Sequence, residues 1–214
     1  MIGLYVTVPV ACFRKGLARE YLETESLPPP ATCYGFLLSL VGETNRHRHI
    51  GCRVVPVLIN KPSTSVVLRT VWRVKKTPLG SSGNTRPDYQ QLLTGIELLV
   101  WMDSSNEEGS GLEARVRLAL TNPEEISRFG GLCLGESTHL VDEVTLIEKV
   151  KPRLTDRIGR SFLIAPKGRL TLPIWVDHVG SAGTRYVTGD LVARPLLQQP
   201  GVDEMPQINP GGSP

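Results

Sequence analysis

The sequence predicts an α+β fold whose strands and helices follow one another in the order β, α, β, β, α, β. Three observations lead to this prediction. Residues 27–43 combine three consecutive prolines with one short, very apolar helix. Segments rich in Val and Ile lie on both sides of that helix and have the lengths of strands. A second helix-capping signature, within residues 121–131, precedes another strand-like segment.

The first helix is predicted within residues 27–43 (LPPPATCYGFLLSLVGE). Pro28 and Pro29 hold the entry extended, and Pro30 suits a first helical turn because its missing N–H would have no intrahelical partner there. Gly42 tolerates the positive φ of a helix stop. The buried face has the i, i+3, i+4, i+7 spacing of Tyr34, Leu37, Leu38 and Val41. We expect this apolar helix face to pack against a sheet.

Strands are predicted before and after this helix. Residues 3–11 (GLYVTVPVA) read as a first strand, in which Pro9 favours an edge or a bulge. Residues 12–26 have no clear period and are expected to be a loop. Residues 53–60 form the second strand, and residues 66–76 are expected to pair with it as a hairpin.

Turn chemistry separates the next segments. Residues 78–87 (PLGSSGNTRP) have the composition of a mobile loop that orders on a ligand. Residues 96–103 are strand-like, and the polar turn 103–111 joins them to an alternating segment at 112–120. We therefore predict a second hairpin there.

The second helix is predicted within residues 121–131, with Asn122 as N-cap and Pro123 at the first helical position. A glycine-rich passage, FGGLCLGEST at 129–138, follows and leads to a strand at 139–150. Glycines this dense permit close approach of a phosphate or of another strand. The passage lacks the spacings of nucleotide-binding loops.

Together these elements predict a ferredoxin-like domain at residues 1–150, enlarged between its second and third core strands. A short β-rich extension is expected at 151–197, and 198–214 have the composition of a disordered tail. The strands expected in the extension are 161–164, 169–176 and 184–191.

Composition limits the possible classes of protein. The 214 residues are 40% hydrophobic and 21% charged, enough for one globular domain with an elaboration. The longest apolar runs fall short of the roughly 20 residues that span a bilayer, and the N-terminus is a poor signal peptide. We therefore expect a cytoplasmic protein without membrane contact. Four scattered cysteines indicate neither zinc nor disulfides, so no metal or cofactor is expected.

Charge is distributed in blocks. No acidic residue lies between Glu43 and Asp88, whereas 88–148 are mainly acidic and a second basic run begins at Lys149. A polyanion is the obvious partner, and a solvated face is the simpler alternative. The first basic block contains Arg46, Arg48, Arg53, Lys61, Arg69, Arg73, Lys75, Lys76 and Arg86.

Residues 69–75 alternate with a period of two, so Arg69, Arg73 and Lys75 share one strand face. Trp72 lies on the opposite face, where we expect it to belong to the core.

Several of these features resemble one known family. They are the first strand, a loop with Phe13 and Arg14, the segment PPPATCYGFLLSLVGE, a basic hairpin excursion, and FGGLCLGES after the second helix. Over about residues 1–150 the chain resembles the CRISPR-associated family five, whose members are repeat-associated (RAMP) subunits of type I Cascade complexes in antiviral defence.

The resemblance implies an RRM-like, ferredoxin-like palm and a β-hairpin thumb within about 60–95. It implies that the palm caps the 5′ repeat-derived handle of the CRISPR RNA (crRNA). We expect a non-catalytic role, because both His47 and His49 belong to a polar loop in which a solvated or phosphate-contacting histidine is the more common case. The implied partners are the crRNA, the family-seven backbone subunit and a large family-eight subunit, with target DNA contacted indirectly. The implied handle site combines the loop after the first strand, the start of the first helix and the glycine-rich loop.

Phosphate contacts, base stacking and hydrogen bonds to base edges hold single-stranded RNA. The candidate RNA-binding residues supply these groups: Phe13, Arg14, Lys15, Thr32, Tyr34, Arg46, Arg48, Arg69, Arg73, Lys75, Lys76, Arg86, Gly130, Gly131, Gly135 and Ser137. Trp72 and Tyr89 are further stacking candidates.

Two alternatives stay open. In some relatives the palm cleaves the repeat, and a metal-independent endoribonuclease needs a general base and a general acid. Tyr34, His47 and His49 would be the catalytic candidates. The other alternative is a ferredoxin-like module that binds only proteins.

Overall fold

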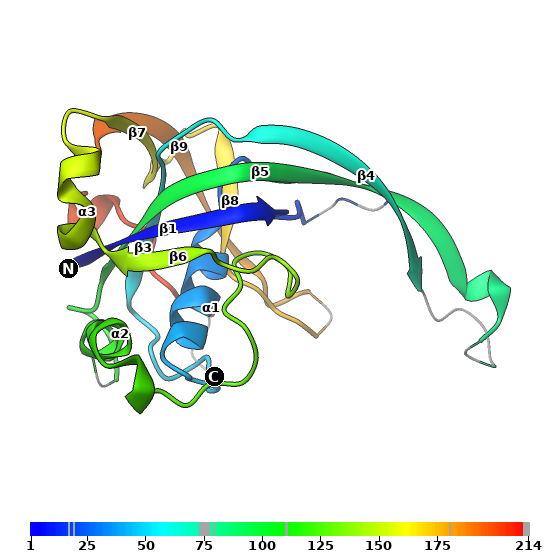
Figure 1. The fold of residues 1–214 in the computed structure, drawn as a ribbon, viewed down its shortest axis with the longest axis horizontal. Helices are drawn as coiled ribbons and strands as arrows, with labels where there is room; N and C mark the ends of the chain where they lie inside the picture. Colours follow the sequence, from blue (N-terminus) through cyan, green and yellow to red (C-terminus); the bar gives the residue numbers. More distant parts are fainter. Residues whose placement is uncertain are drawn as a thin grey trace.

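The chain forms a mixed α/β fold around one large, mostly antiparallel sheet (Figure 1). This computed structural model describes residues 1–211 except 17, 19, 73–77, 79, 110 and 180. The elements are β1 (Ile2–Ala11), β2 (Tyr21–Leu22), α1 (Pro30–Leu40), β3 (Arg53–Leu58), β4 (Ser63–Trp72), η1 (Ser82–Asn84), β5 (Thr85–Asp103), α2 (Leu112–Thr121), η2 (Pro123–Glu125), β6 (Glu143–Leu146), α3 (Ile147–Leu154), β7 (Ile158–Ile164), β8 (Leu170–Trp175), β9 (Arg185–Pro195) and η3 (Val202–Glu204).

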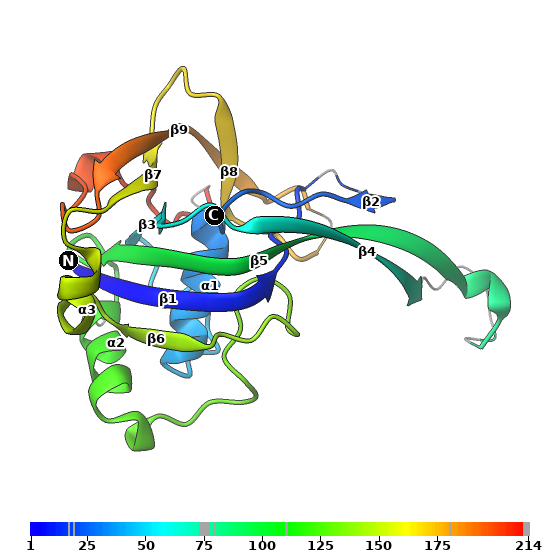
Figure 2. The same cartoon turned by 45° about the horizontal axis from the view of Figure 1, so that its top comes forward.

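Strand β5 is the backbone of the sheet. Its second half lies between β1 and β3, with Ile2 opposite Met102 and Val54 also opposite Met102. The strand order is β6-β1-β5-β3-β7-β9-β8, so the C-terminal strands continue the same sheet. The first half of β5 leaves the body and pairs with β4 in a long hairpin, which projects in both Figure 1 and Figure 2.

The central strands carry a separate core on each face of the sheet, and a smaller apolar cluster lies at the C-terminal strands. Alternate residues of β1, such as Leu4 and Val6, pack on the face covered by α1 and α2. The residue between them, Tyr5, packs on the other face with Trp101 and α3. The period of two therefore divides each central strand between the helix pair and α3.

The predicted helix at 27–43 and the strands at 3–11 and 53–60 are confirmed, but the predicted strand at 112–120 is wrong. This segment is helix α2, and its buried residues Leu112, Val116 and Ala119 follow the helical period. Arg117 also forms an i,i+4 ion pair with Glu113 at 3.2 Å. The alternation of Arg115 and Arg117 is local and does not continue along a strand face.

The predicted pairing of the second and third strands is also wrong. Strand β4 pairs with the first half of β5, from Ser63 opposite Thr94 to Trp72 opposite Thr85. Strand β3 instead lies between β5 and β7. The loop composition of residues 78–87 concealed the start of β5, whose great length lets one strand serve both the sheet and the hairpin.

Two predictions further along the chain are wrong in extent. Only the short turn η2 forms within 121–131, and the Asn122 side chain donates to the Glu125 carboxylate at 3.0 Å instead of capping a helix. In the segment 139–150, strand β6 is four residues long and gives way to α3.

The predicted disorder of residues 198–214 is wrong for the described residues, 198–211. The Ile208 N–H donates to the Cys52 carbonyl at 2.8 Å, and its carbonyl accepts from Gly51 at 3.0 Å. The side chains of Met205 and Ile208 are 0% exposed. Two well-placed apolar residues hold a segment whose average composition is polar.

Among the described residues, no helix is long and apolar enough to cross a membrane. In the same part of the chain, no group of three His, Cys, Asp or Glu side chains is arranged to hold a metal ion.

The buried C-terminal segment leads to a stability prediction. Replacement of Ile208 by Ala should lower the free energy of unfolding by about 2–5 kcal/mol, because it removes fully buried methylene groups. Urea unfolding measures this change. The control Val202→Ala changes a more exposed apolar side chain of the same segment and should shift stability by about 0.5 kcal/mol or less. Equal, small effects of both substitutions would contradict the packing described.

Candidate nucleic-acid interface

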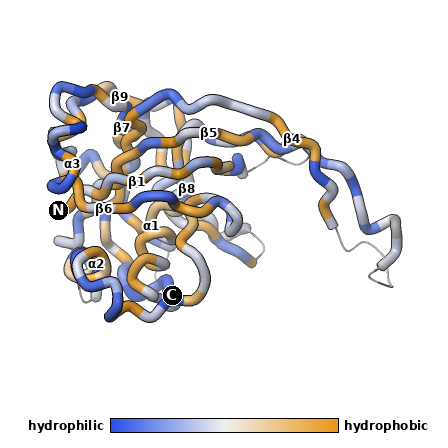
Figure 3. Tube along the Cα trace, in the orientation of Figure 1, coloured by the Kyte–Doolittle hydropathy of each residue, from blue (hydrophilic) through white to orange (hydrophobic). Residues whose placement is uncertain are grey.

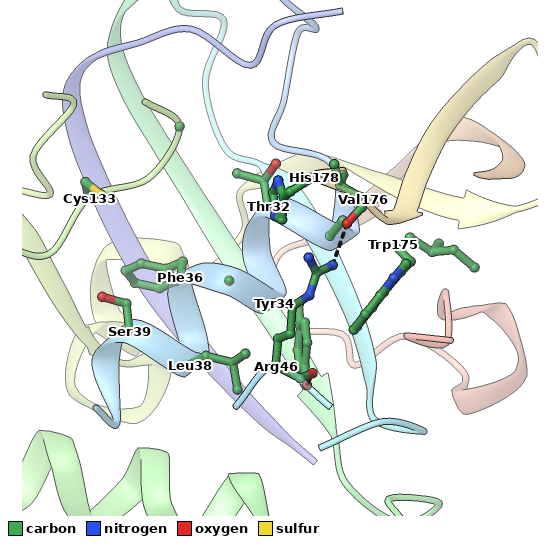
Figure 4. Close-up of a pocket in the computed structure, with 14 residues that line it drawn as sticks. Thr32, Tyr34, Phe36, Leu38, Ser39, Arg46, Cys133, Trp175, Val176 and His178 are labelled. Atoms are coloured by element: carbon green, nitrogen blue, oxygen red, sulfur yellow. Dashed lines mark hydrogen bonds between the residues drawn. The ribbon is translucent and has the colours of Figure 1, made fainter. Parts of the chain in front are cut away.

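A cavity of about 340 Å³ lies where the first turn of α1 meets the glycine-rich loop and the end of β8 (Figure 4). Its wall combines apolar side chains with a few polar ones. The lining residues that carry the argument below are Thr32, Phe36, Ser39, Arg46, Cys133, Gly135, Trp175 and His178.

The three prolines set the start of α1 as the sequence predicted. Pro29 is the N-cap, with φ −58° and ψ 153°, and its carbonyl accepts hydrogen bonds from the N–H groups of Thr32 and Cys33 at 2.9 and 3.0 Å. Pro30 occupies the first helical position. This fixed entry directs Thr32 and Gly35 to the cavity while Cys33 and Leu37 enter the core.

Arg46 is held rigidly at the wall of this cavity. The Tyr34 hydroxyl donates to the Arg46 carbonyl at 2.7 Å, and burial raises the pKa of Tyr34, which keeps this donor protonated. The Arg46 guanidinium donates to the Val176 carbonyl at 2.6 Å and lies 3.8 Å from the ring centroid of Trp175. The His47 ring meets the same indole edge-on at 4.9 Å. A cation–π contact and one hydrogen bond therefore fix the guanidinium, and the Tyr34 hydrogen bond fixes the main chain that carries it.

The glycine-rich loop packs closely on the end of β1. Gly135 has φ +109°, and a Cβ there would lie 3.0 Å from the Cys12 carbonyl oxygen. The Nδ1 atom of His139 accepts the N–H groups of Cys12 and Glu136 at 3.2 and 3.0 Å, and burial lowers the pKa of His139, which favours this neutral acceptor. The close approach of the main chain at Cys12, just after β1, thus explains why position 135 is a glycine. Gly130, Gly131 and Ser137 are exposed.

Two of the predicted phosphate ligands already have carboxylate partners. Arg69 of β4 donates to Glu136 of the glycine-rich loop at 3.2 Å, and Gln90 of β5 donates to the same carboxylate at 3.0 Å. Arg86 contacts Asp88 at 2.7 Å and Glu20 at 3.2 Å. The bonds to Glu136 fasten the hairpin to the glycine-rich loop, whereas Arg86 bonds within β5 and to the segment before β2. The predicted ligands Arg73, Lys75 and Lys76 lie outside the described residues.

The other face of the hairpin is apolar and exposed. Tyr21, Tyr89 and Leu68 are register partners on β2, β5 and β4, and all three are exposed. Trp72, on the same face of β4, is 64% exposed, so its predicted place in the core is wrong. The hairpin has left the body at this point, and Trp72 therefore has no core to enter.

The remaining candidates lie apart from the cavity lining. Phe13 is 2% exposed and packs in the main core, so its ring is not available for stacking. Arg14 is exposed, and Lys15 lies 3.7 Å from Glu23. Arg48 is paired with Glu43 at 3.1 Å.

The alternative catalytic residues differ in accessibility. The Tyr34 hydroxyl is engaged with the Arg46 carbonyl, whereas His49 is fully buried between Glu107 and Arg115. Of the three, only His47 is exposed.

His49 belongs to a polar cluster that holds the loop carrying Arg46. Arg115 of α2 donates to Glu43 at 2.5 Å and contacts His49 at 2.8 Å, and Glu107 hydrogen-bonds the other side of the imidazole. The hydrogen bond from Arg115 is the main reason that the pKa of Glu43 is lowered to about 2. The cluster joins the end of α1 to α2 and to the loop after β5.

Solved structures similar to this chain indicate its fold, and a relative of similar sequence indicates its family. A chain of a CRISPR RNA-guided surveillance complex has the same fold, with a TM-score of 0.57 and 12% identity over 94% of this chain and 95% of that chain. A further match, titled a crystal structure of a Cas protein, has a TM-score of 0.47 and 15% identity over 91% of this chain and 94% of that one. No protein-family model matches.

The CRISPR-associated protein Cas5 of Myxococcus xanthus (strain DK1622) is 52% identical to this chain over 212 residues, which cover 97% of each protein. The chain therefore belongs to the Cas5 family. This confirms the family that the proline-helix segment and the glycine-rich loop indicated.

Sequence reasoning missed the β8 side of the cavity. Trp175 ends the short strand β8, and Val176 and His178 come just after it, with no spacing that marks a site. Arg46 contacts Val176 across 130 positions of sequence, and such a contact has no local signal.

The lowered pKa of Glu43 predicts a specific dependence of stability on pH. Because the folded pKa of about 2 lies below the ordinary value of 4.5, the ionised carboxylate stabilises the fold above about pH 4.5, and this contribution is lost as the pH falls towards 2. The difference in unfolding free energy between the wild type and Glu43→Gln should therefore be constant from pH 7 to 5 and shrink below 4.5. Urea unfolding at several pH values measures it.

Glu108→Gln provides the matched control. Glu108 is exposed and forms no ion pair within the described part of the chain. Its substitution makes the same change in charge, and we expect a small difference from the wild type throughout. A Glu43→Gln difference that stays the same down to pH 2.5 would contradict the role of Arg115.

Proposed function

We propose that this chain is a non-catalytic RNA-binding subunit of a type I Cascade complex and caps the 5′ repeat-derived handle of the crRNA. The four strands β6-β1-β5-β3, with α1 and α2, would be the ferredoxin-like palm, and the β4–β5 hairpin would be the thumb. The observation that carries the proposal is the cavity itself. In a Cas5 family member, it joins the α1 start to the glycine-rich loop, the two segments expected to hold the handle.

The chemistry of the surface suits single-stranded RNA. Arg46 offers a guanidinium plane, Thr32 and Ser39 offer hydroxyl groups, and the hairpin offers the exposed rings of Trp72 and Tyr89. Stacking planes and hydrogen-bonding groups are what unpaired bases require. The net charge of the chain is only +3, so attraction of an RNA would depend on cations close to the site and not on the overall charge of the protein.

The proposal includes protein neighbours, namely the family-seven backbone subunit and the large family-eight subunit, through which target DNA is contacted indirectly. The exposed surface of the hairpin supports the proposal that other subunits bind there. Within the described residues, the outer edge of β4 pairs with no strand, and Val66, Leu68 and Trp72 expose apolar surface there. Open strand edges and apolar patches of this kind are typical sites of subunit contact.

A non-catalytic role agrees with the state of the candidate acid–base groups. Tyr34 and His49 are buried and hydrogen-bonded within the fold, where they stabilise the loop that carries Arg46. The endoribonuclease alternative remains testable, because His47 is exposed beside the cavity.

RNA binding should depend on the predicted thumb cations. We expect the triple substitution Arg73→Ala, Lys75→Ala, Lys76→Ala to weaken binding of the repeat-derived handle. It should also reduce the slope of log K against log salt by about 2, the value for three lost phosphate contacts on a single strand. Filter binding of labelled RNA at several salt concentrations measures both quantities.

The matched control makes the same change in charge on a different element of the fold. Lys149→Ala, Lys151→Ala, Arg153→Ala alters helix α3, which carries both hydrophilic and hydrophobic residues in Figure 3 and covers the second core. We expect this variant to bind the handle as the wild type does. Equal losses of RNA affinity in both variants would show that the attraction is nonspecific. If the wild type retains no RNA, the protein-binding alternative would be favoured.

The same samples test the ribonuclease alternative. We expect repeat RNA that is incubated with the protein in EDTA to remain intact on a denaturing gel. Cleavage at one phosphodiester that disappears with His47→Ala would instead establish the enzyme.

A further inference from the structure

We propose that the cavity between α1, the glycine-rich loop and β8 holds one unstacked nucleobase of the bound RNA, stacked on the Arg46 guanidinium. This inference rests on the proposed RNA-binding function. It adds the chemical class of the group that enters the cavity and the surface on which it lies.

The Arg46 guanidinium is a pre-formed stacking plane. Trp175 lies 3.8 Å from its central carbon, and the hydrogen bond to the Val176 carbonyl prevents rotation. Trp175 itself is buried, so its ring cannot move away. Figure 4 shows Trp175 on one side of the guanidinium and Phe36 and Cys133 across the cavity on the other. A planar ligand that enters there continues the stack that Trp175 begins.

The remaining walls suit an aromatic heterocycle with polar edges. Phe36, Leu38 and Ile174 supply apolar surface. The side chains of Thr32, Ser39 and His178 also line the cavity, and they form no hydrogen bond with any part of the chain that the structure describes. Binding sites for small planar groups typically combine an apolar wall with a few convergent polar groups in roughly 300–1,000 Å³. At about 340 Å³ this cavity is near the lower limit, as expected for a single base.

The surroundings favour a base over a phosphate. An Arg that binds phosphate uses the edge of its fork, but here one N–H is already bound to Val176 and the face lies on Trp175. Asp177 adds negative charge nearby. The N–H groups of Val179 and Gly183 donate to its carboxylate at 2.9 and 3.0 Å, which lowers the pKa of Asp177, and its charge acts on Arg46. The site is therefore less cationic than Arg46 alone suggests.

An abasic scan tests the inference without any protein variant. Handle RNAs that each lack one base, with the phosphate backbone intact, are titrated against the full chain. We expect one position to lose affinity by about 5-fold to 100-fold, the range for one base stacked on a protein side chain, and its neighbours to lose much less. A uniform profile would overturn the inference. If the intact handle does not bind at all, the proposed function itself fails.

The variant Arg46→Lys then tests whether the RNA position found by the abasic scan binds in this cavity. Lysine keeps the charge and the aliphatic stem but has no plane, so it preserves a phosphate contact and abolishes stacking. We expect the variant to bind the intact handle more weakly, by the same factor as the abasic penalty, and to show no further loss with the abasic RNA. Wild-type affinity together with an unchanged abasic profile would overturn the inference and indicate a phosphate at Arg46.

A further measurement checks that Arg46→Lys is folded. The Tyr34 hydroxyl holds the main-chain carbonyl of residue 46, which every substitution retains. Arg46→Lys loses the hydrogen bond to Val176, so we expect a somewhat lower midpoint of thermal unfolding, with the variant still folded at the temperature of the RNA titration. Under that condition a change in RNA binding reports the lost plane.

Discussion

The continuity of β5 is the constraint on which the rest of the structure depends. One strand from Thr85 to Asp103 hydrogen-bonds to β1 and β3 in its second half and to β2 and β4 in its first half. Because the same backbone runs through both parts, the hairpin leaves the body in a direction set by the twist of the central sheet. Glu136 reinforces this direction by holding Arg69 and Gln90, which lie partway along the hairpin. The proposed thumb is thus a rigid extension of the proposed palm.

The candidate site lies where three remote segments meet against that sheet. The prolines orient α1, the contact of Gly135 with Cys12 places the glycine-rich loop, and Trp175 at the end of β8 closes the cavity. Arg46 joins the first and last of these by touching both Tyr34 and Val176. The cluster of Glu43, His49, Glu107 and Arg115 holds the loop behind it. A fixed guanidinium loses little further entropy when a ligand stacks on it, which would favour the proposed binding of a flexible single strand.

The distribution of charge in space differs from the distribution in sequence. Between Glu43 and Asp88 the sequence is purely basic, yet Arg48, Arg69 and Arg86 find carboxylates that come from elsewhere in the chain or from the ends of that block. The hairpin therefore exposes aromatic and aliphatic side chains on one face and uses its described arginines for attachment on the other. The described surface of the hairpin is thus more apolar than the basic block of the sequence suggests.

Local sequence determined the elements whose signals are local. Three prolines before apolar residues at helical spacing specify α1, and runs of Val and Ile specify β1 and β3, because φ restriction and side-chain periodicity act over a few residues. The family was likewise evident from the proline-helix and glycine-rich motifs. Only the tertiary structure decided that 112–120 is a helix, that β4 pairs with β5, that Ile208 is buried and that Trp175 completes the cavity. Each of these depends on a partner far away in sequence, and burial against such a partner outweighs a weak local preference.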